Sequence, residues 1–229
     1  MRIAEIFCSL QGEGKLAGTP SAFVRVSGCD LRCRWCDTPY ASWQPEGQDM
    51  SVGAIVDRLR AMPVGHVVLT GGEPLIMPEA VELCDAIKAM GFHLTLETSA
   101  TVYRPVRLDL ASMSPKLANS TPSRQQYAHL AEAHDRRRLN LSAIQQFIDC
   151  SPEFQLKFVV VCESDIAEIE TVLSRLTGWR KSDVLLMPEG VDAQTLRARA
   201  AWVAEVCMRK GWRYCPRLHI ELWGNRRGK

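Results

Sequence analysis

Three cysteines that lie close together in the sequence are the residues of this chain best suited to chemistry. Cys29, Cys33 and Cys36 occur in the segment GCDLRCRWCDT, with three and two residues between them. Thiolates at this spacing can turn toward one point from a single loop, so they can hold an iron–sulfur cluster or a metal ion. Three ligands leave one iron of a four-iron cluster open, and an open iron can bind a small molecule.

Chance does not explain this spacing, because with 9 cysteines among 229 residues a given triple is expected only about 0.01 times in the chain. A zinc knuckle and a group of three buried thiols remain as alternatives. A structural zinc site normally has four ligands, and His66 or Cys8 would have to supply the fourth.

The composition is that of a soluble globular protein, with 46% hydrophobic and 24% charged residues. A net charge of +2 excludes a strongly basic surface as the organising feature, so no nucleic-acid partner is expected. The amino terminus MRIAEIFCSLQGEG lacks the apolar run of a secretory signal, and no later segment is apolar for long enough to span a membrane. We therefore expect a cytoplasmic protein with no membrane partner.

Cysteines in an unsecreted chain indicate metal chemistry rather than disulfides. The six cysteines outside the cluster have apolar neighbours, and we expect them to be small buried hydrophobes: Cys8, Cys84, Cys150, Cys162, Cys207 and Cys215.

The elements that must position these groups follow a regular alternation of apolar runs and helical patterns. Strands are expected over 2–10, 21–27, 66–70, 92–96, 106–113, 155–161, 184–187 and 217–222, and helices over 51–62, 78–90, 141–148, 165–176 and 193–210. The stretch 119–138 is polar and ends in a run of three arginines, 136–138, which we expect to be a solvated face or a loose loop.

No internal repeat, linker or change of composition divides the chain, so we expect a single domain over 1–229. Strands alternating with helices indicate an α/β fold with a parallel sheet and right-handed crossovers. The repeats are too few for a closed eight-stranded barrel. The sequence therefore predicts a partial, splayed TIM-type (β/α) barrel with its motifs at the carboxyl ends of the strands.

Two strand-associated motifs could form a small-molecule site. In the turn after the first strand, Gln11 and Glu13 offer an amide and a carboxylate, which would complement a ligand edge that carries hydrogen-bond donors and acceptors, although the turn could also be a simple hairpin loop. Arg25 stands between two valines, and a buried arginine needs an anionic partner. Within the chain, that partner could be Glu5 or Glu97.

The spacing Cys-x3-Cys-x-aromatic-Cys, with Trp35 as the aromatic residue, resembles the signature of the radical S-adenosylmethionine (SAM) superfamily. Within it, the flanking residues resemble the family of 7-carboxy-7-deazaguanine synthases. The likeness is carried by 7–14, Arg25, GGEP at Gly71, ETSA at Glu97 and SPK at Ser114, and it covers about half of the chain.

The resemblance implies three cofactors: a [4Fe-4S] cluster on Cys29, Cys33 and Cys36, SAM, and Mg²⁺ with Thr38 as a ligand. It implies that SAM is bound by Trp35, Gly72, Glu73, Ala100, Ser114, Pro115 and Lys116. Of these, Gly72 and Glu73 would receive the amino group of the methionine, and Ala100 stands where the family usually has glycine. The substrate would be bound by Leu10, Gln11, Gly12, Glu13, Arg25 and Thr98, with Arg25 on a carboxylate.

The implied reaction is that of a radical SAM lyase in queuosine biosynthesis, a tRNA modification pathway. It removes hydrogen from C6 of 6-carboxy-5,6,7,8-tetrahydropterin, contracts the ring and releases ammonia to give 7-carboxy-7-deazaguanine. The implied partners are this small pterin, an electron donor such as flavodoxin or ferredoxin, and a second copy of the chain in a homodimer. No catalytic residue is assigned beyond the cluster and SAM, and the basic end of the chain receives no role.

Two other functions are open at this point. A glycyl-radical-enzyme activating enzyme shares the cluster and SAM chemistry but acts on a protein, and it should lack the QGEG turn and Arg25. A non-enzymatic zinc-binding module would be colourless, whereas an iron–sulfur protein is brown.

Overall fold

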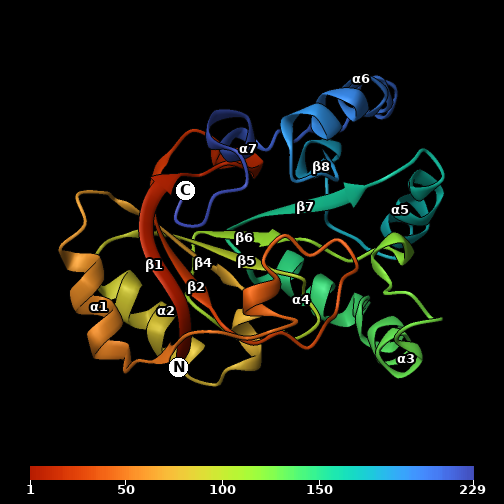
Figure 1. The fold of residues 1–229 in the computed structure, drawn as a ribbon. Coiled ribbons are helices and arrows are strands. Elements are labelled where there is room, and N and C mark those ends of the chain that lie inside the picture. The colour runs from red at the N-terminus through yellow and green to blue at the C-terminus, as the bar shows by residue number, and fades with distance from the viewer.

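The computed structural model describes residues 1–229 as one open sheet of nine strands with helices on its outer face (Figure 1). The strand order is β3-β1-β2-β4-β5-β6-β7-β8-β9, with bounds β1 Arg2–Leu10, β2 Pro20–Val26, β3 Gln48–Asp49, β4 His66–Gly71, β5 His93–Thr98, β6 Leu110–Met113, β7 Glu153–Val160, β8 Val184–Pro188 and β9 Arg213–Tyr214. The edge strands β3 and β9 do not pair with each other, so the barrel is open, as predicted.

All pairings from β2 to β9 are parallel, whereas β1 forms antiparallel pairs with β2 and β3. The short β3 was not expected from the sequence. Parallel strands need a crossover connection between them. In this chain the longer crossovers are helical: α1 Val52–Arg60, α2 Ala80–Ala89, α3 Ala128–Arg137, α4 Leu141–Cys150, α5 Asp165–Leu173 and α6 Ala193–Lys210, with α7 Leu218–Trp223 after the last strand.

Local sequence explains where several helices begin and end. The side chains of Ser51, Asn140 and Asp192 each accept a hydrogen bond from the backbone N–H three residues later, at the start of α1, α4 and α6. Gly211 ends α6 in the left-handed region, with φ of 70°. Consequently α6 has the predicted bounds.

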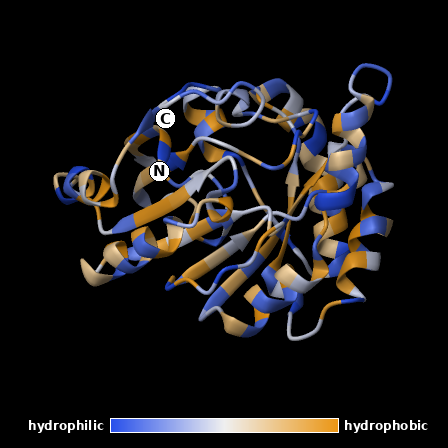
Figure 2. Cartoon of the chain, turned by 90° about the horizontal axis from the view of Figure 1, so that it is seen from below, coloured by the Kyte–Doolittle hydropathy of each residue, from blue (hydrophilic) through white to orange (hydrophobic).

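The strands separate an apolar outer layer from a polar interior. Along β7, Leu156, Phe158 and Val160 belong to the hydrophobic core, whereas Lys157 and Val159 line the cavity inside the barrel. Figure 2 shows hydrophobic residues along the central strands and on parts of the helices packed against them. On the other strands, the same alternation directs polar side chains into the interior of the barrel.

Two predicted strands differ from the structure. The strand expected over 106–113 begins only at Leu110, because the side chain of Asp109 accepts a hydrogen bond from the backbone N–H of Leu94 at 2.7 Å in place of a ladder bond. The segment 217–222 is the helix α7, so the predicted strand is wrong. Its alternating apolar pattern misled the prediction, since Ile220 is buried but Leu222 is 52% exposed. The last strand is instead β9.

The polar stretch 119–138 contains α3, and the arginine run 136–138 lies at the end of this helix rather than in a loose loop. Arg136 and Arg137 are exposed, as expected. Arg138 is not solvated, because its Nη1 donates to Glu168 Oε1 at 2.7 Å. This ion pair connects the end of α3 to α5.

All nine cysteines are free. Of the six outside the cluster, Cys84, Cys207 and Cys215 are buried as expected. The prediction is wrong for the other three, which are exposed: Cys8, Cys150 and Cys162. The helices of the structure are all too short or too polar to cross a membrane.

Candidate active site

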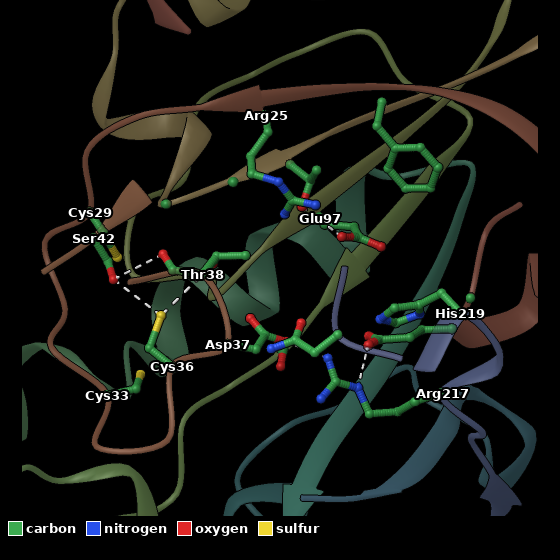
Figure 3. Close-up of a pocket in the computed structure, with 18 of the residues that line it drawn as sticks. Arg25, Cys29, Cys33, Cys36, Asp37, Thr38, Ser42, Glu97, Arg217 and His219 are labelled. Atoms are coloured by element: carbon green, nitrogen blue, oxygen red, sulfur yellow. Dashed lines mark hydrogen bonds and ion pairs between the residues drawn. The ribbon is translucent and has the colours of Figure 1, made fainter. Parts of the chain in front are cut away.

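A single cavity of about 490 Å³ lies inside the barrel at the carboxyl ends of the parallel strands, a size suited to small-molecule ligands. It gathers residues from distant parts of the sequence (Figure 3). In that view the cysteines lie on one side and Arg217 and His219 on the other, with Arg25 and Glu97 between them. The predicted site residues that line it are Leu10, Gln11, Gly12, Glu13, Arg25, Cys29, Cys33, Trp35, Cys36, Thr38, Gly72, Thr98, Ser114 and Lys116.

Strand register explains this convergence. Arg25 on β2 is paired with Thr70 on β4, and Glu97 on β5 with Ser112 on β6, so all four side chains face the interior at a similar height. Parallel strands in register place their carboxyl ends at one edge.

The cysteine loop is held by backbone contacts on several sides. Gly28 N donates to Ala41 O at 2.8 Å, and Trp43 Nε1 donates to Cys33 O at 3.0 Å. On the side of α3, Arg32 N donates to His134 Nδ1 at 3.1 Å. Burial lowers the pKa of His134 to about 4, so its ring is neutral and can accept this bond. No sequence motif pointed to His134, which supports the loop from a helix more than 100 residues further on.

The donor set of the loop suits an iron–sulfur cluster. Burial raises the pKa of the Cys33 thiol to about 12, so loading with iron must displace its proton. Nowhere in the chain do three His, Cys, Asp or Glu side chains converge as they would around a single metal ion. A four-iron cluster presents its irons at separate corners and needs no such convergence.

The fourth zinc ligand considered above is not at hand. His66 begins β4, roughly 16 Å from the carboxyl end of that strand at the strand's rise per residue. Its ring is buried between Ser21 Oγ and Thr95 Oγ1, each at 2.8 Å. Cys8 does not line the cavity.

Glycines at the end of β4 allow the GGEP turn to approach the cysteine loop. A Cβ on Gly72 would lie 1.8 Å from Gly28 O, which only glycine avoids. The next residue continues this contact, since Glu73 N donates to Gly28 O at 2.9 Å. The close approach fixes the loop against the sheet.

Three predicted SAM-binding residues do not line the cavity: Glu73, Ala100 and Pro115. The Glu73 carboxylate is fully buried and accepts hydrogen bonds from Thr98 Oγ1 at 2.7 Å, Ser99 N at 2.8 Å and Ser99 Oγ at 2.6 Å. Burial raises the pKa of Glu73. Ala100 has φ of 57°, in the left-handed region that glycine adopts more easily. Glu73 and Ala100 therefore lie behind the cavity wall at the end of β5.

Lys116 and Trp35 lie together on one wall of the cavity. Lys116 Nζ donates to Ser114 O at 2.9 Å and to Ser114 Oγ at 2.8 Å, and it lies 5.8 Å from the centroid of the Trp35 ring. Trp35 Nε1 donates to Asn119 O at 3.0 Å. The predicted motifs SPK and CRWC therefore lie on the same wall of the cavity.

Arg25 is anchored at one nitrogen only. Its Nε donates to Glu5 Oε1 at 2.7 Å, and its guanidinium carbon lies 5.7 Å from the Phe7 ring centroid. Its partner is therefore Glu5 and not Glu97. The two terminal nitrogens have no hydrogen-bond partner in the chain and form a fork directed to the cavity, a geometry that matches a carboxylate.

We call the part of the cavity around Gln11, Glu13, Glu97, Lys157 and Arg217 its floor. The two carboxylates of this floor already have hydrogen-bond or ion-pair partners within the chain. Glu97 accepts from Gln11 Nε2 at 3.0 Å and from Thr70 Oγ1 at 2.7 Å. Glu13 pairs with Lys157 and with Arg217, whose Nε lies 3.0 Å from Glu13 Oε1. Burial alone would raise the pKa of Glu13, but these two cations lower it well below its ordinary value.

Sequence reasoning did not identify four residues at or beside this floor as site residues: Glu97, Lys157, Arg217 and His219. A charge inside the apolar run QLKFVVV was a usable signal for Lys157. Arg217 also pairs with Asp37, beside the cysteine loop, and His219 covers Gly12 so closely that a Cβ there would lie 1.9 Å from its Nδ1. Both were hidden by the wrong assignment of 217–222 as a strand.

Comparisons with known proteins agree with this geometry. Residues 23–142 match the family model described as the Radical SAM superfamily. The chain is 47% identical to the 7-carboxy-7-deazaguanine synthase of Halobacterium salinarum over 97% of this chain and 90% of the relative. It is 44% identical to the enzyme of that name from Rhodopirellula baltica over 99% and 88%. The chain belongs to the 7-carboxy-7-deazaguanine synthase family.

Solved structures share the fold. The crystal structure of QueE from Escherichia coli superposes with a TM-score of 0.72 and 24% identity, over 93% of this chain and 92% of that one. SuiB from Streptococcus suis gives 0.56 and 13%, over 84% and 47%.

Membership of a radical SAM family implies a [4Fe-4S] cluster, SAM, a small-molecule substrate and a reductant. Neither the glycyl-radical activating function nor the zinc module is favoured by these relatives.

Proposed function

We propose that this chain is a 7-carboxy-7-deazaguanine synthase. It would convert 6-carboxy-5,6,7,8-tetrahydropterin into 7-carboxy-7-deazaguanine with release of ammonia, as a carbon–nitrogen lyase in queuosine and related deazapurine biosynthesis. The observation that supports this most strongly is the free fork of Arg25, which lies in the same cavity as three unpaired thiols. A carboxylate-bearing substrate and a radical cofactor can therefore meet there.

Cys29, Cys33 and Cys36 would hold the cluster. When bound, the cluster and SAM together supply a one-electron route to removing a hydrogen atom from substrate. Trp35, Gly72, Ser114 and Lys116 would bind SAM along the cofactor wall. Glu73, Ala100 and Pro115 would act behind that wall by fixing the backbone that SAM touches.

The substrate would lie between Arg25 and the cavity floor. Arg25 binds its carboxylate through two parallel hydrogen bonds, while Gln11 and the engaged carboxylates of Glu13 and Glu97 face its heterocycle. Leu10, Gly12 and Thr98 complete the contact surface. Because the ion pairs of Glu13 fix its position before binding, the pocket is preorganised.

Mg²⁺ is proposed to bind at Thr38, with the substrate supplying further oxygens. Thr38 Oγ1 lies on the cavity wall, 3.8 Å from Cys36 Sγ. A single hydroxyl and a substrate make a weak site in the free protein, as is usual for magnesium. The metal would therefore bind together with substrate.

The remaining proposals concern the setting of the enzyme. We expect a single-domain cytoplasmic homodimer that receives electrons from a donor such as flavodoxin or ferredoxin, with no nucleic-acid or membrane partner.

The test is anaerobic incubation of the iron-loaded protein with SAM, reductant and the carboxytetrahydropterin, while the deazapurine chromophore is recorded. SAM cleavage without pterin turnover would refute the proposed substrate but would leave the assignment to the radical SAM superfamily intact. Arg25→Ala should abolish pterin turnover and leave uncoupled SAM cleavage intact. Equal loss of both activities would assign Arg25 a structural role instead.

A further inference from the structure

The basic end of the chain borders the proposed substrate site. Asn225–Lys229 lines the cavity and runs beside β1 (Figure 1), where Arg227 Nη2 donates to Ala4 O at 3.3 Å. The Arg227 guanidinium lies 4.2 Å from the centroid of the Tyr40 ring. Its Nη1 donates to Glu46 Oε2 at 2.8 Å. One arginine therefore fixes the tail to two segments, β1 and the loop 40–46.

Arg227 also touches the carboxylate that anchors Arg25. Its Nε lies 3.6 Å from Glu5 Oε2, while Glu5 Oε1 accepts from Arg25 Nε at 2.7 Å and from Tyr40 Oη at 2.8 Å. The two oxygens of Glu5 are thus divided, with one facing Arg25 and Tyr40 and the other facing Arg227.

This arrangement of the two Glu5 oxygens determines which nitrogens of Arg25 are available to a ligand. A carboxylate beside a guanidinium favours a bidentate pair, with one oxygen on Nε and the other on a terminal nitrogen. In this structure Glu5 Oε2 is drawn to Arg227, so Arg25 keeps both terminal nitrogens free. Without Arg227, that oxygen would turn to Arg25 and compete with an incoming carboxylate.

We propose that Arg227 is a positioning residue for recognition of the substrate carboxylate, acting through Glu5 and Tyr40 on Arg25. This inference rests on the proposed function, because it needs a carboxylate-bearing substrate at Arg25. The Arg227 side chain is 46% exposed, so its ion pair with Glu5 is weak and sensitive to salt.

The experiment compares two fluorescent, unreactive probes, 6-carboxypterin and pterin without the carboxyl group, on the oxidised, iron-loaded enzyme with SAM. Dissociation constants are measured by fluorescence quenching for the wild type, Arg227→Ala, Arg227→Lys and Arg209→Ala. Arg209 is the matched control, because it is an exposed arginine of α6 that does not line the cavity.

Arg227→Ala should weaken binding of 6-carboxypterin roughly fivefold and leave binding of unsubstituted pterin unchanged. Arg227→Lys should recover part of the loss, since lysine restores a charge beside Glu5 but cannot span Glu5 and Glu46. Arg209→Ala should bind both probes like the wild type. In an Arg25→Ala background, Arg227→Ala should have no further effect.

Equal weakening of both probes by Arg227→Ala, or the same loss in Arg209→Ala, would overturn the inference in favour of a general effect on binding. An unchanged dissociation constant for 6-carboxypterin would overturn it directly. Either result can occur while the wild type turns over carboxytetrahydropterin normally, so failure here is distinguishable from failure of the proposed function.

Discussion

Glu73 offers a sharp test of how the GGEP motif works in this chain. The family resemblance assigns it to the amino group of SAM, yet its carboxylate is fully buried and faces Thr98 and Ser99. The informative substitution is Glu73→Gln, which conserves volume and replaces one carboxylate oxygen by an amide NH₂. No cavity forms, so any loss of stability comes from the hydrogen bonds.

The magnitude follows from the donors around Glu73. The carboxylate accepts from Thr98 Oγ1, Ser99 N, Ser99 Oγ and Leu75 N. The amide oxygen of the glutamine can accept the hydrogen bonds on one side of the group. On the other side, the Ser99 hydroxyl can rotate to accept a hydrogen bond from the NH₂. The backbone N–H of Ser99 cannot, and a buried donor left unpaired costs about 1–3 kcal/mol. In a domain of this size, this corresponds to a fall in Tm of roughly 2–12 °C.

Urea and thermal unfolding of the cluster-free protein measure this loss, and isothermal titration of the oxidised, loaded enzyme measures SAM binding. Glu163→Gln is the control, because Glu163 is exposed. We expect Glu73→Gln to lower stability by about 2 kcal/mol and to weaken SAM binding only modestly. Unchanged stability together with a tenfold or greater loss of SAM affinity would refute the reasoning, since the carboxylate would then reach the cofactor.

Three further predictions concern the cluster, the metal and pH. Cys29→Ala should abolish iron loading and turnover, and retained anaerobic activity would contradict its assignment as a ligand. Thr38→Ala should raise the Mg²⁺ concentration needed for half-maximal stimulation, so an identical magnesium titration would remove Thr38 from the metal site. Burial lowers the pKa of His66 from 6.5 to about 4 in the folded state. The unfolded chain therefore takes up the proton first, and stability should fall as pH decreases from about 6.5 toward 4. This slope, followed by the urea midpoint, should be smaller in His66→Gln, and an equal slope in both proteins would show that another group is responsible.

Much of the fold follows from local sequence. The bounds of α6 and β1, the helix start at Ser51 and the cysteine loop were predicted within a residue or two. Such features depend on short-range sterics, helix capping and hydrophobic periodicity, all of which are determined by residues close together in the sequence. The open α/β barrel follows from the order of those elements.

Tertiary structure alone decided how the charges inside the barrel are paired. Glu13 meets Lys157 and Arg217 across 144 and 204 residues, and Arg25 selects Glu5 although Glu97 was as plausible from the sequence. Strand register and the helical form of 218–223 determine these partners. The sequence by itself determined which groups are present and near which strand ends they lie. Which of these groups are already neutralised, and which remain free to bind a ligand like the fork of Arg25, follows only from the packing of the open sheet. The physical reason is that desolvation and ion pairing depend on neighbours far away in the chain.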